Sequence, residues 1–216
     1  MKIDKLESYK ILVPFLGQAL GADYEVALQK VSEGDFRIVA IANGHISGRK
    51  VGAPLTDFAL QLIKEKKYLE HDFIVGYSGK SKSGERLRSS TFFIKDGSEI
   101  LGMLCINHDC SKILDITNSL LSLVQEPQLT LAESYSNTDD PTKYIETFPE
   151  SIADLINSAA GIDLSNNPVK LSSDDNKRIV KVLEQKGIFQ LKGAVSEVAV
   201  ALKISEATLY RYLKNI

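Results

Sequence analysis

The chain has 216 residues, of which 44% are hydrophobic and 25% are charged, and its formal net charge is −2. This profile is typical of a globular protein with one or two domains. No apolar run approaches the ~18 residues of a membrane-spanning helix, and no basic-then-apolar leader opens the chain. We therefore expect a cytoplasmic protein without a membrane partner. Two cysteines are too few for a disulfide framework.

The charged residues are unevenly distributed along the chain. Residues 1–124 carry 16 basic and 15 acidic groups, residues 125–169 carry one and eight, and residues 170–216 carry nine and five. The three net charges are therefore +1, −7 and +4. We predict three parts with these boundaries: a near-neutral body, an acidic helical linker and a basic terminal domain. A locally basic domain is what a polyanion binder needs.

The first predicted elements are one helix and two strands. Apolar residues recur at helical spacing over residues 4–20, where Pro14 is expected to kink the helix and Gly17 and Gly21 to mark its end. Short apolar runs predict strands over residues 25–31 and 36–42. Asn43-Gly44 then ends the second strand.

A helix capped by Thr56 and three closely spaced strands are predicted next. The helix is expected to reach about Lys67, and the strands to cover residues 73–77, 87–94 and 100–107. Short connections require antiparallel neighbours. This part of the chain is therefore predicted to form an α+β domain with a curved five-stranded antiparallel sheet and flanking helices.

The region after the sheet is expected to be mainly helical. Apolar spacing predicts a helix over residues 111–125. Residues 126–141 are polar and carry two prolines, which is typical of a linker. Helical spacing resumes over residues 142–160, interrupted by Pro149, and a loop follows over residues 161–168.

The last 45 residues contain three helix signals in close order. The first helix begins after Ser172 or Ser173 and ends at Gly187, and the second covers about residues 194–202. A turn over residues 203–205 separates the second helix from the third, for which Ser205 is the N-cap. Two short helices joined by so short a turn cross at a steep angle. We predict an all-α domain here.

The third helix exposes side chains that suit the major groove of double-stranded DNA. Arg211 can pair with a guanine edge or with a phosphate. Tyr210, Thr208 and Ser205 can donate to phosphates, helped by the helix N-terminus. The predicted DNA-binding residues are Lys203, Ser205, Glu206, Thr208, Tyr210 and Arg211.

Residues 198–213 resemble the helix-turn-helix of bacterial regulators and site-specific recombinases. One position departs from the pattern, because Lys203 stands where the turn usually has glycine; a non-glycine residue there costs modest strain. The alternative is a small helical bundle that binds a protein partner.

Three strings in the first half resemble the YheO-like PAS transcriptional regulator family. They are IANGHISGR with VGAPLT (residues 41–56), RLRSST (86–91) and GMLCIN (102–107). The resemblance covers roughly residues 5–120. It implies that residues 1–124 form a PAS-like sensor domain, followed by a C-terminal helix-turn-helix. The family includes a regulator of D-arginine use, which does not fix the ligand of this chain.

A small-molecule effector is expected in the sensor domain. Asn43, His45, Ser47 and Arg49 lie in the loop after a buried strand, where a flap over the sheet would form. Arg86 and Arg88 share one face of a later strand. If either arginine points inward, the expected ligand is a carboxylate such as an amino acid, because a guanidinium group binds a carboxylate through two parallel hydrogen bonds. Otherwise, His45 ties the loop to the sheet and the arginines face solvent.

The sequence thus predicts a ligand-responsive transcription regulator that binds operator DNA. No metal site, cofactor or enzymatic constellation is expected. Helix-turn-helix proteins usually read two half-sites as dimers, so we expect a homodimer, formed through the segments 4–20 and 111–124 unless these cover their own sheet. The alternative is a dimerising signalling module whose helical tail binds a protein.

Overall fold

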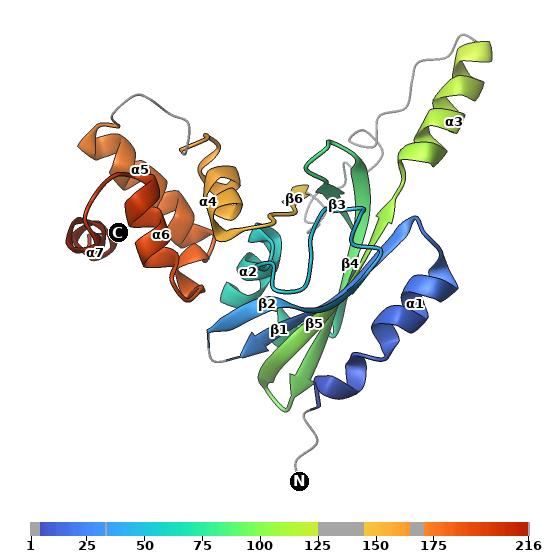
Figure 1. Ribbon diagram of the computed structural model, residues 1–216, viewed down its shortest axis with the longest axis horizontal. Coiled ribbons are helices and arrows are strands. Elements are labelled where there is room, and N and C mark those ends of the chain that lie inside the picture. The colour runs from blue at the N-terminus through green and yellow to red at the C-terminus, as the bar shows by residue number, and fades with distance from the viewer. Residues whose placement is uncertain (1–4, 33, 125–144, 165–170, 216) are drawn as a thin grey trace.

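The protein has a curled sheet with a helix on either face, and a group of helices beside it (Figure 1). The structure, a computed structural model, describes residues 5–32, 34–124, 145–164 and 171–215. The predicted linker at residues 126–141 lies outside the described residues. The predicted domain boundaries therefore stay predictions.

The five predicted antiparallel strands are confirmed. Their order in the sheet is β2-β1-β5-β4-β3, and each neighbouring pair is antiparallel. Such pairs need only short connections. The five strands are β1 (Tyr24–Ser32), β2 (Asp35–Ala42), β3 (Phe73–Lys80), β4 (Arg86–Asp96) and β5 (Glu99–Asp109).

A sixth strand, β6 (Ile145–Thr147), pairs in parallel with β3 at the edge of the sheet. The prediction of helical structure over residues 142–160 is therefore wrong at its start. Helix α4 (Ile152–Ala160) begins only after Pro149, with Ser151 as its N-cap. A proline disfavours helical backbone in the residue before it, and a strand of three residues is too short to show a period of two.

The N-terminal helix is shorter than predicted and is not kinked by its proline. A 3₁₀ turn η1 (Glu7–Tyr9) precedes α1 (Leu12–Leu20). Pro14 lies in the first turn of α1, where no helical hydrogen bond is lost. Gly17 does not end the helix. A Cβ atom at Gly17 would lie 2.5 Å from Cβ of Ala42, so glycine allows α1 to approach β2 closely.

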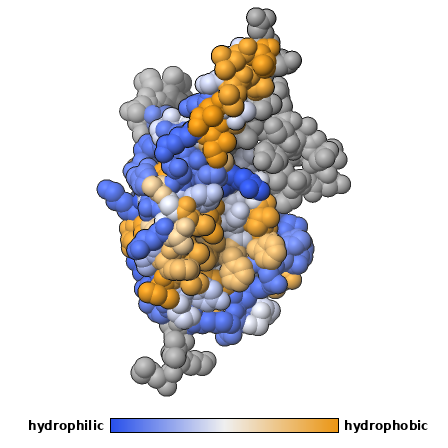
Figure 2. All heavy atoms as spheres, turned by 90° about the vertical axis from the view of Figure 1, so that its right-hand side faces the viewer, coloured by the Kyte–Doolittle hydropathy of each residue, from blue (hydrophilic) through white to orange (hydrophobic). Residues whose placement is uncertain are grey.

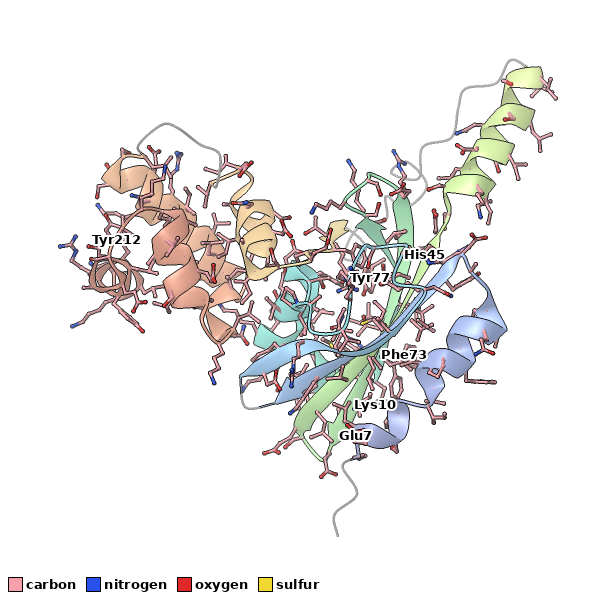
Figure 3. The ribbon with its side chains drawn as sticks, viewed as in Figure 1. Glu7, Lys10, His45, Phe73, Tyr77 and Tyr212 are labelled. Carbon is pink, nitrogen blue, oxygen red and sulfur yellow. The ribbon has the colours of Figure 1, made fainter. Side chains whose placement is uncertain are left out.

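The two faces of the sheet are covered by different helices. The outer face packs against η1 and α1 through a small apolar cluster that includes Val13, Val26 and Leu28. The inner face is covered by α2 (Asp57–Lys64), where Phe58 lies 4.6 Å from Tyr77 between ring centroids. Figure 3 labels Tyr77 within the sheet domain.

The helix α2 also packs against the C-terminal helices. One continuous apolar core contains residues of α2, of the inner face, of α4 and of the three helices within residues 173–213. Two ion pairs join the surfaces: Lys64 lies 3.1 Å from Glu184, and Lys186 lies 3.5 Å from Asp57. The sheet domain and the helical group therefore share a core along α2.

The remaining helices agree closely with the predicted ones. They are α3 (Ser111–Leu123), α5 (Ser173–Gln185), α6 (Ala194–Ala201) and α7 (Glu206–Leu213), with short 3₁₀ turns η2 (Lys67–Leu69) and η4 (Ile188–Gln190). α5 begins with a capping box between Ser172 and Asp175, and Gly187 follows its end with a φ of 76°. None of the helices in the described ranges is long and apolar enough to span a bilayer.

Replacement of Gly17 tests the contact between α1 and β2. Gly17→Ala should destabilise the protein by about 1–3 kcal/mol, because the added methyl group overpacks against Ala42 and must push the helix away. Gln18→Ala is the matched control, because Gln18 is exposed on the same helix. Urea unfolding of both variants measures the difference, and an unchanged midpoint for Gly17→Ala would contradict the packing described.

Candidate functional site

The turn between α6 and α7 has the geometry of a Schellman motif. The N–H of Ile204 donates to the carbonyl of Ala199 at 3.0 Å, and the N–H of Lys203 donates to that of Val200 at 3.1 Å. Lys203 has the left-handed conformation that this turn requires, with a φ of 55°. The departure from glycine is thus accommodated, at a cost of about 1 kcal/mol.

The buried side of α7 is fixed to α5 and α6. Leu209 is fully buried, and the hydroxyl of the buried Tyr212, labelled in Figure 3, lies 3.1 Å from Oγ of Ser173 at the start of α5. Ser196 of α6 donates a hydrogen bond to the carboxylate of Glu206. These contacts orient α7 so that its opposite side faces solvent.

The predicted DNA-binding residues lie along the exposed side of α7 and the turn before it. Two of them also cap the helix, because Oγ of Ser205 accepts from the N–H of Thr208 at 3.2 Å and lies 3.0 Å from its hydroxyl. Thr208 is half-buried. The exposed side chains are Lys203, Ser205, Glu206, Tyr210 and Arg211.

Sequence reasoning missed a basic group on α5 beside α7. Lys177, Arg178 and Lys181 line a hollow of about 250 Å³ together with Tyr212 and Asn215. Residues three and four apart on a helix are neighbours, and Lys181 lies three residues after Arg178 and four after Lys177, so the spacing of this group is visible in the sequence. The group adds positive charge next to the predicted DNA contacts.

A second cluster of polar residues is buried on the inner face of the sheet. Glu25 of β1 is directly paired with Asn107 of β5, and Asn107 with Ser89 of β4. Glu146 of β6 lies opposite Gly79 of β3. We call Glu25, Asn107, Ser89 and Glu146 the inner-face row; each is at most 2% exposed.

The loop after β2 closes over one end of the inner-face row. Ser47 donates to one carboxylate oxygen of Glu25 through its N–H at 3.2 Å and its hydroxyl at 2.5 Å. Arg49 and Asn107 donate to the other oxygen at 3.2 Å and 2.8 Å. The guanidinium of Arg49 also lies 4.8 Å from the centroid of the Phe148 ring. Ser47 and Arg49 are therefore held inside the domain.

Glu146 closes the other end of the row. The hydroxyl of Thr56, which also caps α2, donates to one oxygen of its carboxylate at 2.6 Å. Burial raises the pKa of Glu146 to about 7, while the Thr56 hydrogen bond and the charge of Arg49 lower it. No sequence pattern marks this residue, because the apolar spacing of residues 142–160 predicts a helix in an acidic linker.

The other predicted effector-binding residues do not reach the inner-face row. The amide of Asn43 donates to the carbonyls of Gly17, Gly21 and Tyr24, which ties the end of α1 to β1. His45 is exposed.

Arg86 and Arg88 are also exposed, because they alternate with the inward residues Leu87 and Ser89 along β4. The condition for a carboxylate site, an arginine of this strand pointing inward, is not met by either residue.

A smaller polar chain lies next to the row. The hydroxyl of Tyr77 lies 2.8 Å from that of Thr91, which is 3.3 Å from Sγ of Cys105. Burial raises the pKa of Tyr77 well above its ordinary value and that of Cys105 to about 12, so both groups stay protonated near neutral pH. In the described part of the chain, no three His, Cys, Asp or Glu side chains are grouped as metal ligands.

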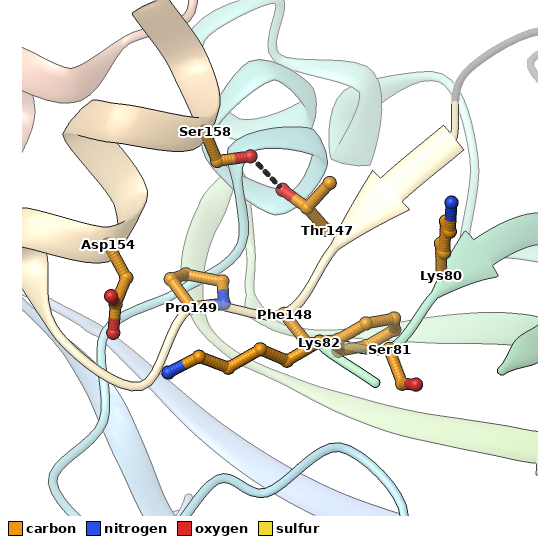
Figure 4. Close-up of a pocket in the computed structure, with 8 residues that line it drawn as sticks. All are labelled: Lys80, Ser81, Lys82, Thr147, Phe148, Pro149, Asp154 and Ser158. Carbon is orange, nitrogen blue, oxygen red and sulfur yellow. Dashed lines mark hydrogen bonds between the residues drawn. The ribbon is translucent and has the colours of Figure 1, made fainter. Parts of the chain in front are cut away.

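A hollow of about 260 Å³ lies beside β6 and the start of α4 (Figure 4). Phe148 is one of its walls, and the same ring contacts Arg49 on the inside. A Cβ atom at Gly79 would lie 2.8 Å from this ring, so glycine provides the space that Phe148 fills. Phe148 thus separates the hollow from the inner-face row.

The fold and these two clusters define a PAS-type sensor domain joined to a C-terminal helix-turn-helix. The YheO-like PAS domain family matches residues 1–125, and an HTH domain family matches residues 152–214. The chain therefore belongs to the YheO-like PAS family, as its sequence motifs indicate. The HTH match includes α4, which packs against α5 and α6.

The chain is similar to known proteins over almost all of its residues. The chain is 30% identical to "Uncharacterized protein YheO" of Escherichia coli, over 98% of this chain and 85% of the relative. It is 27% identical to an uncharacterized protein of Haemophilus influenzae and to "Transcriptional regulator DauR" of Pseudomonas aeruginosa, which it covers to 90% and 94%. The domain architecture is that of a transcription regulator.

The raised pKa of Glu146 makes a prediction about stability. An acid whose pKa is higher in the folded state than in the unfolded state favours folding when protonated, so its contribution falls as pH rises from its ordinary value through about 7. The free energy of unfolding of Glu146→Gln, measured relative to that of the natural protein, should therefore rise by about 3 kcal/mol between about pH 4 and pH 8.

Urea unfolding at several pH values measures this difference, and Glu150→Gln, at an exposed residue beside Lys82, is the control. A difference between Glu146→Gln and the natural protein that is independent of pH would rule out a buried, proton-binding Glu146.

Proposed function

We propose that this protein is a transcription regulator that binds operator DNA through α7 and responds to a small molecule bound in its sensor domain. The observation that supports DNA binding most strongly is the orientation of α7. Its apolar side packs against α5 and α6. Its exposed side presents Tyr210 and Arg211, and the turn before it presents Lys203. Exposed residues of a second, recognition helix are those that enter the major groove.

The basic group on α5 supports the same proposal. Lys177, Arg178 and Lys181 lie beside α7, although Lys177 is paired with Asp174, which lines the same hollow. Arg178 and Lys181 remain for phosphate, and contacts of lysine and arginine with phosphates provide most of the non-specific affinity for DNA. Arg211, on α7 itself, is in a position to read a base or to bind a phosphate.

The shared core along α2 supports coupling between the two domains. α2 contacts the inner face of the sheet on one side and the helical group on the other. Its N-cap, Thr56, is hydrogen-bonded to Glu146 of the segment that leads into α4. A change at the inner face can therefore alter the position of the helices through these direct contacts.

We also propose that the protein acts as a homodimer through its outer apolar surface. Figure 2 shows hydrophobic side chains along α3 and over the outer side of the sheet domain. Ile113, Ile116, Leu120 and Leu123 of α3 are 56–79% exposed, and their spacing of three and four residues forms one stripe. Exposed patches of this kind mark interaction sites. Further exposed apolar residues are Ile11, Phe15, Phe73, Val75 and Phe92.

Replacement of Arg211 tests the DNA interface. Arg211→Ala should weaken binding to the operator by about 1–3 kcal/mol and relax specificity at one position if Arg211 contacts a base. It should weaken binding evenly across sequences if Arg211 contacts only phosphate. Gel-shift titrations at low salt, starting with the promoter region of the protein's own gene, provide the measurement.

Arg37→Ala is the matched control, because Arg37 lies on β2, outside the helix-turn-helix. Equal binding by the natural protein and Arg211→Ala would exclude α7 as the interface. A complete absence of DNA binding at low salt would instead favour a protein partner for the helical tail.

Replacement of Leu120 tests the homodimer. Leu120→Asp should convert the dimer to a monomer, because a carboxylate in the middle of an apolar interface is desolvated without a partner. Ser119→Asp is the control, since Ser119 precedes Leu120 on α3 and is itself exposed and polar. Sedimentation velocity measures the mass of both variants. A natural protein that is monomeric at all concentrations would rule out this part of the proposal.

A further inference from the structure

The inner-face row contains an unusual concentration of unpaired polar atoms. Eight buried side-chain atoms of the described residues have no hydrogen-bond partner, and four of them lie in the row or on Arg49 beside it: Nη1 of Arg49, Oγ of Ser89, Oδ1 of Asn107 and Oε2 of Glu146. All four residues are at most 2% exposed. Buried polar groups are almost always hydrogen-bonded, so a group of four such atoms in one place indicates a site for a further polar molecule.

The four atoms are close together because of strand pairing. Asn107 and Ser89 are direct partners on neighbouring strands, which lie about 4.8 Å apart. Arg49 is joined to Asn107 through the carboxylate of Glu25. The hydroxyl of Ser89 is near enough to Glu146 to lower the pKa of that carboxyl as a hydrogen-bond donor.

The charge of the site is negative when Glu146 is ionised. The carboxylate of Glu25 is compensated by Arg49, from which it accepts a hydrogen bond. Only the neutral hydroxyls of Thr56 and Ser89 act on the carboxylate of Glu146 as donors, and the cation that lowers its pKa, Arg49, is already paired with Glu25. Two of the four unpaired atoms, on Asn107 and Glu146, are acceptors only. This combination suits a hydrogen-bond donor with a positive charge.

We propose that the inner-face row binds a small molecule through a protonated amine, which Glu146 and Asn107 accept, while Nη1 of Arg49 donates to an oxygen of the same molecule. The proposal rests on the sensing role proposed above and names the chemistry of its ligand. It replaces the carboxylate expected from Arg86 and Arg88, because both of these side chains are on the outer face.

The position of Glu146 gives the site a direct connection to the DNA-binding helices. Glu146 lies on β6, outside the residues matched by the PAS family and six residues before α4. An amine bound to Glu146 would hold β6 against β3 and Thr56 against the start of α2. The route into the site is past Phe148, which separates it from the hollow beside α4.

The test is thermal unfolding of the full chain with matched probes at constant ionic strength. Ethanolamine and 1,4-diaminobutane carry amines, whereas ethylene glycol and 1,4-butanediol have hydroxyl groups in their place, and acetate supplies a carboxylate. At pH 8 the amines should raise the melting temperature by about 3 °C or more when present in large excess over their dissociation constants. The diols and acetate should leave it unchanged.

Two further arms assign the effect to Glu146. The amine shift should disappear in Glu146→Gln and persist in Glu150→Gln. It should be smaller at pH 5.5, where Glu146 is protonated; the other charged or titratable groups that face Glu146 are Arg49, Asp57, Tyr77 and Cys105.

An amine shift that survives in Glu146→Gln, an equal shift with diols or acetate, or no shift at about 50 mM amine would overturn the proposal. Gel shifts distinguish a failure of the ligand proposal from a failure of the proposed sensing role. Amine binding without any change in DNA affinity would leave the site intact and contradict the sensing role, whereas DNA binding without an amine shift would contradict only the ligand.

Discussion

The buried carboxylate of Glu25 is the interaction on which the sensor domain depends. Its two oxygens accept hydrogen bonds from Ser47, Arg49 and Asn107, so that one side chain joins β1, β5 and the loop after β2. Removing one partner of a buried ion pair leaves a charge without compensation, which typically costs about 3–5 kcal/mol. The loop is therefore fixed over the inner face, and the position of Arg49 determines where Phe148 and β6 can pack.

The two domains are joined by packing as well as by sequence. α2 belongs to the sensor domain, yet its apolar residues share a core with the C-terminal helices, and β6 adds a strand to the sheet just before α4 begins. Packed cores are rigid and have few voids. A change in the inner face that moves α2 or β6 must therefore be accompanied by a movement of the helical group.

The opposite faces of the sheet have different chemistry. The inner face combines apolar residues with the inner-face row, where charge and hydrogen bonding can select a ligand. The outer face and the stripe on α3 expose large apolar side chains. Alternation along each strand separates the two faces, so that the proposed ligand inside and the proposed second copy outside would contact different residues.

Local patterns in the sequence determined the strands, the helix caps and the helix-turn-helix, because periodicity, Ser172, Ser205 and the turn at Lys203 act within a few residues. The tertiary structure alone decided which polar residues share a site. Arg86 and Arg88 are excluded from the site, and Ser89 belongs to it, because of the face of β4 on which each residue lies. Glu146 reaches the inner face only because β6 pairs with β3. Such pairing joins residues that are distant in the chain, and it depends on the packing of the whole sheet.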